Sequence, residues 1–519
     1  MSRLGFDKWV IILTVVSAAL LQLIDTSIVN VSLIQMMGNM GATLGDISWV
    51  VTGYAASNVV MITLSGWLSA KFGRRNYFAA SIILFTIASI LCGLSDNVWE
   101  LVFFRVIQGI GGGGLLSTAQ AILIETFPKE DLGLANAIFG VGVIIGPTIG
   151  PALGGYITDN LSWPWIFYIN VPIGIAATIC TILFIKEPAE KMRTGAMDWY
   201  GVIFLAVGIG AMQIVLEKGE KEDWFETQYI VVLTIAAVVG IIAFIWRELA
   251  ASHPVVDLRI MKDRSFAVGS LFNFILGFGL FASVFIIPVF AQNILGFTAT
   301  ETGYLLMPGS IVTGFMMPVV AVMMKKRVSP FILSGVGFML FFLFTFDLSH
   351  LNLQVGADDF FWPLIIRGIG LGLIFIPLTT LSLSGLEGRD IPQGTALANM
   401  IRQLGGSFGT AIMTTYISSR TRFHVDTLKD YITPNDPMVQ QRLESFKALF
   451  ISKGYSAYEA TQQAIMSIQG QVVKQALMLT YRDAFLIVGG FFLVCIPLLL
   501  LFKKQKKGSG AQHIEMSME

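Results

Sequence analysis

The stretch WVIILTVVSAALLQLIDTSIVNVSLI, residues 9–34, is an apolar run long enough to cross a bilayer as a helix. One acid, Asp25, lies about two thirds of the way along it. A carboxylate in hydrocarbon is costly, and such residues usually face a protein interior or a water-filled path. We therefore expect Asp25 to face one of these two environments rather than lipid.

Similar runs recur through the 519 residues, of which 55% are hydrophobic and only 13% are charged. A soluble protein of this size needs far more charge on its surface. The sequence therefore predicts an all-α polytopic membrane protein with fourteen spans. The predicted spans are 9–34, 48–70, 77–95, 100–124, 134–157, 164–185, 199–217, 228–247, 266–290, 303–324, 329–347, 360–383, 395–418 and 481–502.

The basic residues of the loops predict the orientation. KFGRR (71–75), KEPAEKMR (186–193) and the tail KKQKK (503–507) are rich in Lys and Arg, whereas alternate loops such as SDNVWE (95–100) are nearly free of them. Because basic loops stay on the cytoplasmic side, both termini are expected there. An even number of spans follows, which supports fourteen.

One long segment, residues 419–480, is expected to form an external loop before the last span. Within it, Ser456-Ala-Tyr-Glu459 matches a capping box, and helical spacing of apolar residues follows, so a helix is expected to run into the last span. The preceding residues 426–437 are rich in turn formers and are expected to be mobile.

A short repeated motif suggests two related halves. QGIGGG (108–113) in the fourth span resembles RGIGLG (367–372) in the twelfth, as expected for a parallel repeat. Spans one to six and nine to fourteen would form the halves, with spans seven and eight inserted between them. The expected division is 1–190 for the first half, 191–255 for the inserted helices, 256–507 for the second half and 508–519 for a cytoplasmic tail.

Arg105 in the fourth span is a second charge inside a predicted span. Helical rise places Asp25 and Arg105 within roughly 6 Å of the same depth, so the two are candidates for an ion pair. In one interpretation, Asp25 binds the coupling proton and Arg105 orients it. In the other, the pair only holds two helices together.

Two glycine-containing motifs are candidates for conformational change. In the fifth span, Gly-Pro pairs favour a hinge or a seal against the other half, although small residues also serve tight packing. At the end of the second span, GWLSAKFGRR (66–75) could form a latch or could simply anchor the topology. The residues concerned are Gly146, Pro147, Gly150, Pro151, Gly154 and Gly155 in the first motif, and Gly66, Gly73 and Arg74 in the second.

Further polar residues are candidates for substrate binding or coupling. Arg367 and Arg402 are charges within predicted spans of the second half, where each could attract an anionic substrate or bond to carbonyls. Glu125 closes the fourth span and could be a proton relay or a solvated interfacial acid. Gln22 and Asn30 flank Asp25 in the first span and complete the candidate set.

Several patterns are missing from the sequence. The glycine-rich GIGGGGLLST (109–118) lacks the Lys-Ser/Thr ending of a phosphate loop, and neither HExxH nor GxSxG occurs. The three cysteines lie in different apolar runs and suggest no metal site or disulfide framework. The formal net charge is zero, and nothing indicates a nucleic-acid partner. An enzyme is therefore not expected.

Taken together, the motifs resemble those of a known family. The motifs are IDTSIVNVSL (24–33), GWLSAKFGRR (66–75), RVIQGIGGG (105–113), GPTIGPALGGYI (146–157) and WPWIFYINVPIG (163–174). They are similar to the signatures of the major facilitator superfamily, in particular its fourteen-span drug:proton antiporters of the EmrB/QacA type. The long external segment and WPLIIRGIG (362–370) look most like the EmrB branch.

The resemblance implies alternating access by two six-helix halves in a bacterial inner membrane, with amphipathic drugs leaving as protons enter. It implies that Asp25 is the membrane acid and Arg105 the fourth-span arginine, and that the region of Gly146 and Pro147 is the antiporter motif. It also implies a periplasmic adaptor and an outer-membrane channel, with segment 419–480 as a docking element, and no cofactor beyond the proton-motive force. One departure is Ala70, where the loop motif usually carries an acid.

The sequence therefore predicts a proton-coupled multidrug exporter. Three alternatives remain at this stage. The chain could export one specific metabolite or couple protons differently, it could be a non-transporting receptor on the same fold, or it could be a channel.

Overall fold

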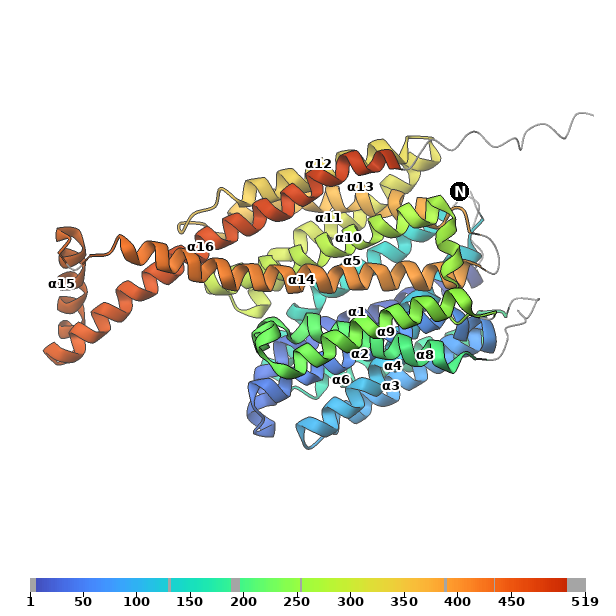
Figure 1. Ribbon diagram of the computed structural model, residues 1–519, viewed down its shortest axis with the longest axis horizontal. Helices are drawn as coiled ribbons and strands as arrows, with labels where there is room; N and C mark the ends of the chain where they lie inside the picture. The colour runs from blue at the N-terminus through green and yellow to red at the C-terminus, as the bar shows by residue number, and fades with distance from the viewer. Residues whose placement is uncertain are drawn as a thin grey trace, which may run out of the picture.

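The apolar runs of the sequence become long helices that lie roughly side by side (Figure 1). The computed structural model describes residues 6–128, 132–187, 197–252, 254–386, 390–433 and 435–501, and within these ranges there is no strand. The predicted tail 508–519, the basic segment 503–507 and residues 188–193 of the basic loop 186–193 lie outside the described residues. The described part of the chain is thus all-α, as predicted.

Seven helices form a first bundle. They are α1 (Phe6–Met40), α2 (Leu44–Phe72), α3 (Arg74–Gly93), α4 (Val98–Thr126), α5 (Leu132–Asn160), the short α6 (Trp165–Tyr168) and α7 (Asn170–Phe184). In this bundle α2 and α3 pack against α4, while α1 packs against α4, α5 and α7. Within the first bundle, the other helices therefore pack against α1 and α4, which carry Asp25 and Arg105.

A second bundle repeats this arrangement further along the chain. It comprises α10 (Arg264–Phe290), α11 (Ala299–Lys325), α12 (Pro330–Leu348), α13 (Phe361–Leu383), α14 (Asp390–Asp430), α15 (Pro437–Ser452) and α16 (Ala457–Leu498). Here α13 lies between α11 and α12, and α10 packs against α13 and α14. Short 3-10 or π turns occur at Glu220–Glu222, Trp224–Glu226, Leu258–Lys262, Ala291–Leu295, Ala357–Phe360 and Leu499–Leu501.

The two glycine motifs that echo each other occupy matching places in the bundles. Gly113 lies so close to α2 that an added Cβ would be 2.6 Å from the carbonyl oxygen of Asn58. On the other side of α4, a Cβ at Gly111 would be 2.6 Å from the backbone nitrogen of Phe85 on α3. In α13, Gly370 likewise lies against Gly337 of α12. The central helix of each bundle therefore uses small residues to approach its neighbours.

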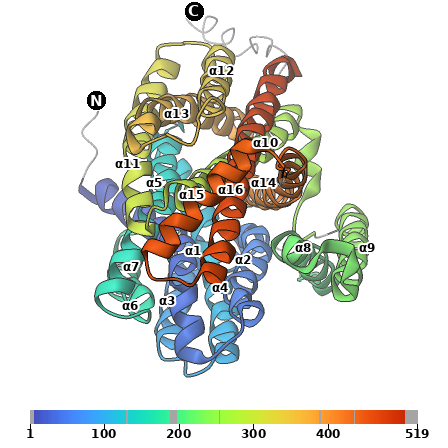
Figure 2. The same cartoon turned by 90° about the vertical axis from the view of Figure 1, so that its left-hand side faces the viewer.

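Two inserted helices, α8 (Trp199–Lys218) and α9 (Gln228–Ala250), form a hairpin at the side of the molecule next to α2 and α14 (Figure 2). The buried Lys218 Nζ donates to Ser48 Oγ of α2 (2.5 Å) and to Gly45 O (3.1 Å). Ser407 Oγ of α14 donates to Gln213 Oε1 of α8 (2.9 Å). The hairpin therefore contacts both bundles.

The other end of this hairpin is closed by an ion pair outside the helices' apolar stretches. Arg247 Nε donates to Asp198 Oδ2 at 2.7 Å. The hydrogen bond from Arg247 holds the pKa of Asp198 below its usual range. Asp198 precedes α8 and Arg247 is near the end of α9, so the pair ties the two helices together.

Twelve helical stretches of the described residues are long and apolar enough to cross a membrane. The two other predicted spans coincide with α5, in which the apolar stretch is Gly133–Val143, and with α14. Polar residues lower the apolarity of α14, and they can be accommodated because its first half is buried between other helices. The prediction of fourteen spans therefore stays a prediction.

The segment 419–480, which was predicted to lie outside the membrane and to contain a helix from Ser456 onward, is helical over most of its length. The outer part of α14, then α15, then the first half of α16 project from one end of the bundle, and we call these residues, 419–480, the stalk (Figure 1). Residues 426–430 belong to α14, and the turn is confined to the residues that follow. The predicted capping box of Ser456 and Glu459 is present, and α16 runs without a break into the last predicted span.

Candidate functional site

Asp25 lies at the centre of a polar cluster inside the first bundle. Its carboxylate is fully buried, and Oδ2 accepts a hydrogen bond from Arg105 Nη1 at 2.5 Å. Oδ1 accepts from Gln108 Nε2 (2.9 Å) and from Asn170 Nδ2 (3.0 Å). The predicted pairing of Asp25 with Arg105 is therefore present in the structure, and both carboxylate oxygens have donors.

Besides Asp25, Arg105 is held by groups from α2 and from its own helix, α4. Its Nε donates to Val50 O of α2 at 3.2 Å, and its Nη1 also donates to Gln108 Oε1 at 2.7 Å. The guanidinium carbon lies 4.0 Å from the ring centroid of Tyr54. A buried ion pair recovers its desolvation cost only where further hydrogen bonds complete it, and these contacts complete this one.

Sequence reasoning missed Gln108 and Asn170, although each left a signal. Gln108 follows Arg105 by three positions, which places both on one face of α4. Asn170 is a lone amide in the otherwise apolar start of α7, and it also donates to Ser89 Oγ of α3 at 3.0 Å. A polar residue within a membrane span suggests a partner, but the sequence does not show which partner.

Gln22 and Asn30 do not join the Asp25 cluster. The buried Gln22 donates to Asn58 Oδ1 of α2 (3.2 Å) and accepts from the backbone N–H of Leu116 in α4 (3.2 Å), so it links three helices. The exposed Asn30 donates to Thr26 O of its own helix (3.4 Å).

The glycines of the fifth span face α1 of the same bundle. A Cβ at Gly146 would lie 2.5 Å from Leu23 Cβ, and one at Gly154 would lie 2.9 Å from Ile28 O. Gly150 faces Ser27 in the same way, and α5 continues as a helix through Pro147 and Pro151. Gly155 is buried. These glycines therefore lie against the part of α1 that carries Asp25.

Two acids from other parts of the chain lie against the loop motif at the end of α2. Arg74 forms an ion pair with Glu125 at the end of α4. The carboxylate of Glu187 lies over Gly73, whose positive φ of 87° suits glycine, and it accepts from the backbone N–H of Asn76 at 3.2 Å. Glu125 is therefore a partner of Arg74 in this structure, and two acids surround the motif although position 70 is Ala.

The two bundles meet along a seam formed by α5 against α11 and α2 against α14. At the end remote from the stalk, a Cβ at Gly133 of α5 would lie 3.7 Å from Ala321 Cβ of α11. At the same end, a Cβ at Gly66 of α2 would lie 2.9 Å from Gln393 Cα of α14. The seam is therefore closed at the end remote from the stalk.

Amide side chains connect the bundles at this closed end. Asn399 Nδ2 of α14 donates to Gln120 Oε1 of α4 at 2.8 Å, and Gln120 Nε2 donates to Asn136 Oδ1 of α5 at 3.2 Å. Asn136 Nδ2 in turn donates to Thr380 Oγ1 of α13 at 3.2 Å. We call these four residues the amide chain. It was not predicted, because its hydrogen bonds join residues up to 279 positions apart.

Arg402 lies in the seam beside the amide chain, and its guanidinium donates to Asn399 Oδ1. Its guanidinium carbon lies 5.9 Å from the ring centroid of Phe139 in the first bundle and 5.4 Å from that of Phe375 in the second. Arg402 is only 4% exposed. The side chain is thus a buried cation between two phenyl rings that belong to different bundles.

Arg367 lies elsewhere, within the second bundle. Its Nε and Nη2 donate to Ser283 Oγ of α10 at 3.2 and 3.1 Å. When QGIGGG (108–113) is aligned with RGIGLG (367–372), Arg367 corresponds to Gln108. Gln108 donates to Asp25 of α1. In the second bundle, Ser283 therefore accepts the hydrogen bonds of Arg367, as Asp25 accepts that of Gln108 in the first bundle.

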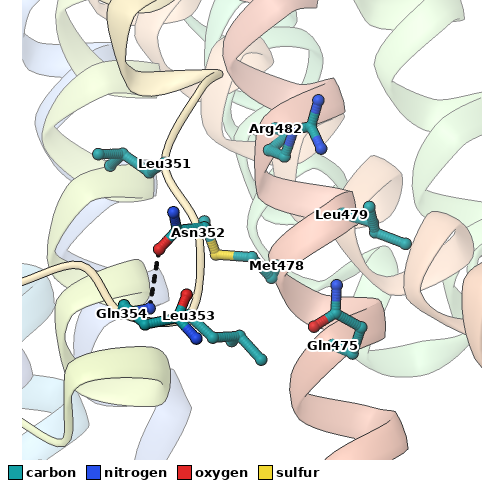
Figure 3. Close-up of a pocket in the computed structure, with 8 residues that line it drawn as sticks. All are labelled: Leu351, Asn352, Leu353, Gln354, Gln475, Met478, Leu479 and Arg482. Atoms are coloured by element: carbon teal, nitrogen blue, oxygen red, sulfur yellow. Dashed lines mark hydrogen bonds between the residues drawn. The ribbon is translucent and has the colours of Figure 1, made fainter.

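A pocket of about 200 Å³ lies near the stalk, between the connection from α12 to α13 and helix α16 (Figure 3). In Figure 3, Met478 of α16 reaches toward Asn352 of the opposing segment, and Gln475 and Arg482 lie on the same helix. None of the predicted site residues lines this pocket.

Known proteins resemble this chain over nearly its whole length. A model of the Major Facilitator Superfamily matches residues 15–410. The chain is 34% identical over 499 residues to the multidrug export protein EmrB of Escherichia coli (strain K12), covering 95% of this chain and 94% of that protein. It is 31% identical over 497 residues to the fatty acid resistance protein FarB of Neisseria gonorrhoeae, covering 96% of each. The crystal structure of the human organic anion transporter MFSD10 (TETRAN) has a TM-score of 0.57 at 12% identity, covering 95% of this chain and 99% of that one, a likeness of fold alone.

Proposed function

Because this chain belongs to the major facilitator superfamily, we propose that it is a proton-coupled multidrug efflux transporter that exports amphipathic toxic compounds by alternating access. Family membership and the EmrB-type resemblance are confirmed by the matches, and with them a multi-pass membrane transporter rather than an enzyme. The relative named a multidrug export protein supports the export of several drugs. The observation that carries the coupling proposal is the buried carboxylate of Asp25 with its three donors.

Proton binding at Asp25 requires a change in its surroundings. In this structure both oxygens accept hydrogen bonds, so the carboxylate is fully satisfied. Protonation removes the negative charge that attracts Arg105 and adds an O–H donor where three donors already converge, so withdrawal of these donors favours the protonated form. Movement of α7 withdraws Asn170, and movement of α4 withdraws Arg105 and Gln108. A shift of helices within the first bundle therefore changes the affinity of Asp25 for a proton, as coupling demands.

Alternating access needs a seam that opens at one end while it closes at the other. The contacts at the end remote from the stalk are closed here, so this structure corresponds to a state sealed at that end. We assign this end to the cytoplasm and the stalk to the periplasm of an inner membrane, following the basic loops. Opening toward the cytoplasm then breaks the amide chain and separates Gly133 from Ala321.

The stalk supports a role in a tripartite pump. Helix α16 has 42 residues, about twice the length that crosses a bilayer, so it projects well beyond the membrane surface. Exposed apolar side chains on the stalk include Tyr431, Met438 and Tyr458, each at least 75% exposed. We propose that a periplasmic adaptor binds the stalk and connects the transporter to an outer-membrane channel.

The coupling proposal is tested by replacing Asp25 with its neutral isostere. Wild-type protein and Asp25→Asn are reconstituted in liposomes, an inward pH gradient is imposed, and drug-induced proton movement is followed with a pH-sensitive dye. We expect drug-dependent proton movement in the wild type and its loss in a variant that still binds drug. The control is Asn30→Asp, which places an acid at an exposed position of the same helix and should not restore coupling to Asp25→Asn.

Proton movement that is unchanged in Asp25→Asn would contradict the proposal. Asp25 would then be a structural partner of Arg105, and Glu125 would be the next residue to replace. Drug binding must be measured in the same preparation, because a buried uncompensated Arg105 could destabilise the variant.

A further inference from the structure

We propose that Arg402, together with Phe139 and Phe375, forms a binding site for amphipathic organic anions in the seam between the two bundles. The inference rests on the proposed export function and names the class of substrate that the seam prefers. The ligand would carry one carboxylate or similar negative group on an apolar, preferably aromatic, body.

The first argument is the uncompensated charge of Arg402. The residue is 4% exposed, and its hydrogen-bond partner is the neutral amide of Asn399. Among the described residues, no carboxylate forms an ion pair with it, whereas Arg105 has Asp25. A buried cation without a counter-ion is costly, and an anionic ligand would supply that counter-ion. A guanidinium also matches the two oxygens of a carboxylate in geometry.

The second argument is the pair of phenyl rings around the cation. Phe139 and Phe375 come from α5 and α13, so they lie on opposite sides of the seam. Both rings are at most 2% exposed, and in this closed state their faces serve as weak substitutes for an anion. The same rings would contact the apolar body of a ligand whose charged group binds Arg402. One polar anchor within an apolar surrounding is typical of small-molecule sites.

The third argument is the way in which the site becomes accessible. Arg402 and Phe375 belong to the second bundle, whereas Phe139 belongs to the first. Opening at the end remote from the stalk separates the first bundle from the second, which removes Phe139 from the cation. The amide chain breaks in the same movement, because Asn399 contacts Gln120 across the seam. A ligand that enters from this end therefore reaches Arg402 when the guanidinium has separated from Phe139.

The other buried cations do not combine these features. Arg367 donates to Ser283, so among the described residues its hydrogen bonds stay within the second bundle. Lys218 lies in the inserted hairpin and is bonded to Ser48 and to the carbonyl of Gly45. The seam therefore carries an excess positive charge at Arg402, which disfavours cationic drugs there and favours anions.

The experiment compares three probes with the same naphthyl body: naphthalene-1-acetate, its neutral amide, and 1-naphthylethylammonium. Binding of each radiolabelled probe to the full chain in lipid nanodiscs is measured by equilibrium dialysis at neutral pH. We expect the wild type to bind the acetate about tenfold or more tightly than the ammonium, the scale of one charge-assisted hydrogen bond. Arg402→Gln should abolish this preference, and Arg402→Lys should retain part of it.

Lys218→Gln is the matched control, because it also removes a buried cation but outside the seam. It should keep the preference for the acetate. If Arg402→Gln does not fold, Phe375→Leu provides a second test, since it should weaken all three probes and leave the preference between charges. Equal binding of the acetate and the ammonium by the wild type would overturn the inference, as would a preference that survives in Arg402→Gln.

These outcomes are separate from those of the Asp25 experiment. Equilibrium binding requires no proton gradient, so the anion preference can fail while drug-induced proton movement persists. Conversely, absence of proton movement with every compound contradicts the proposed coupling and leaves the binding result standing.

Discussion

Asp25 and Arg105 are 80 positions apart in the chain, yet they share one hydrogen-bonded cluster with Gln108 and Asn170. At the scale of residues, each charge inside the described spans is best understood through its partners. The charge of Arg105 is matched by an acid, that of Arg367 by a hydroxyl, and that of Arg402 by an amide and two rings. The same residue type therefore serves a different purpose in each place.

Removal of Asn170 tests how much the cluster depends on its amide donor. Asn170→Ala deletes the bonds to Asp25 Oδ1 and to Ser89 Oγ, and Asn170 is 1% exposed, so no water replaces them easily. We expect a loss of about 1–3 kcal/mol in stability, the usual penalty for buried polar groups left without partners. The measurement is the midpoint of thermal unfolding in detergent.

Asn30→Ala is the control, because the exposed Asn30 has its hydrogen bond to the backbone of its own helix. Its unfolding midpoint should equal that of the wild type. Equal midpoints for both variants would show that Asn170 contributes nothing to the cluster.

At the scale of elements, helix contacts explain where the chain places its small residues. The glycine-rich α4 lies between α2 and α3, and the corresponding α13 lies between α11 and α12. Without a hydrophobic driving force between helices in lipid, close approach through small residues provides the contact. The polar character of α14 has a similar explanation, because it packs against α2, α4, α10 and α16 rather than facing lipid alone.

Gly113→Ala tests this close approach. The added methyl would lie 2.6 Å from Asn58 O and 2.8 Å from the backbone nitrogen of Ile62, so α2 and α4 must move apart. We expect a loss of about 1–3 kcal/mol, as for overpacked cores, measured by thermal unfolding.

Gly490→Ala in α16 is the matched control, since nothing lies within 4 Å of its added methyl. Its midpoint should stay the same or rise slightly, because Ala favours a helix over Gly by about 1 kcal/mol. A Gly113→Ala midpoint equal to that of Gly490→Ala would contradict the tight α2–α4 contact.

At the scale of the whole molecule, the two bundles form a seam that is closed at the end remote from the stalk. The amide chain and the contacts of α5 with α11 belong to this closure. The inserted hairpin bridges α2 and α14 through Lys218 and Gln213, so it must follow both bundles when they move. In the proposed mechanism, opening and closing of the seam is the movement that transport requires.

A disulfide between Gly133→Cys and Ala321→Cys tests whether the seam opens at this end. The Cβ positions are 3.7 Å apart, within the range of a disulfide, and the site joins the two bundles. We expect oxidation to stop transport in proteoliposomes and a reductant to restore it, because a locked seam cannot open to the cytoplasm. The single-cysteine variants, oxidised in parallel, should transport at the rate of the wild type. Full activity of the completely cross-linked protein would exclude opening at this end.

Much of this molecule follows from its sequence, because local patterns dictate it. Apolar runs of bilayer length determine the helices, Ser456 and Glu459 determine where α16 begins, and the successive motifs identify the family. The matched depths of Asp25 and Arg105 were also predictable from helical rise alone. Each of these inferences uses residues close together in the chain or a known period.

Only the tertiary structure determined the partners of the polar residues. Nothing in the sequence pairs Asn399 with Gln120 or places Glu125 against Arg74, because a span of known depth can still face any neighbour. In the stalk, α15 and the outer part of α14 were not predicted for a related reason: outside the membrane, polar helices lack the apolar run that reveals a span. Depth is a one-dimensional property that the sequence records, whereas the choice of neighbour depends on how fourteen predicted segments pack together.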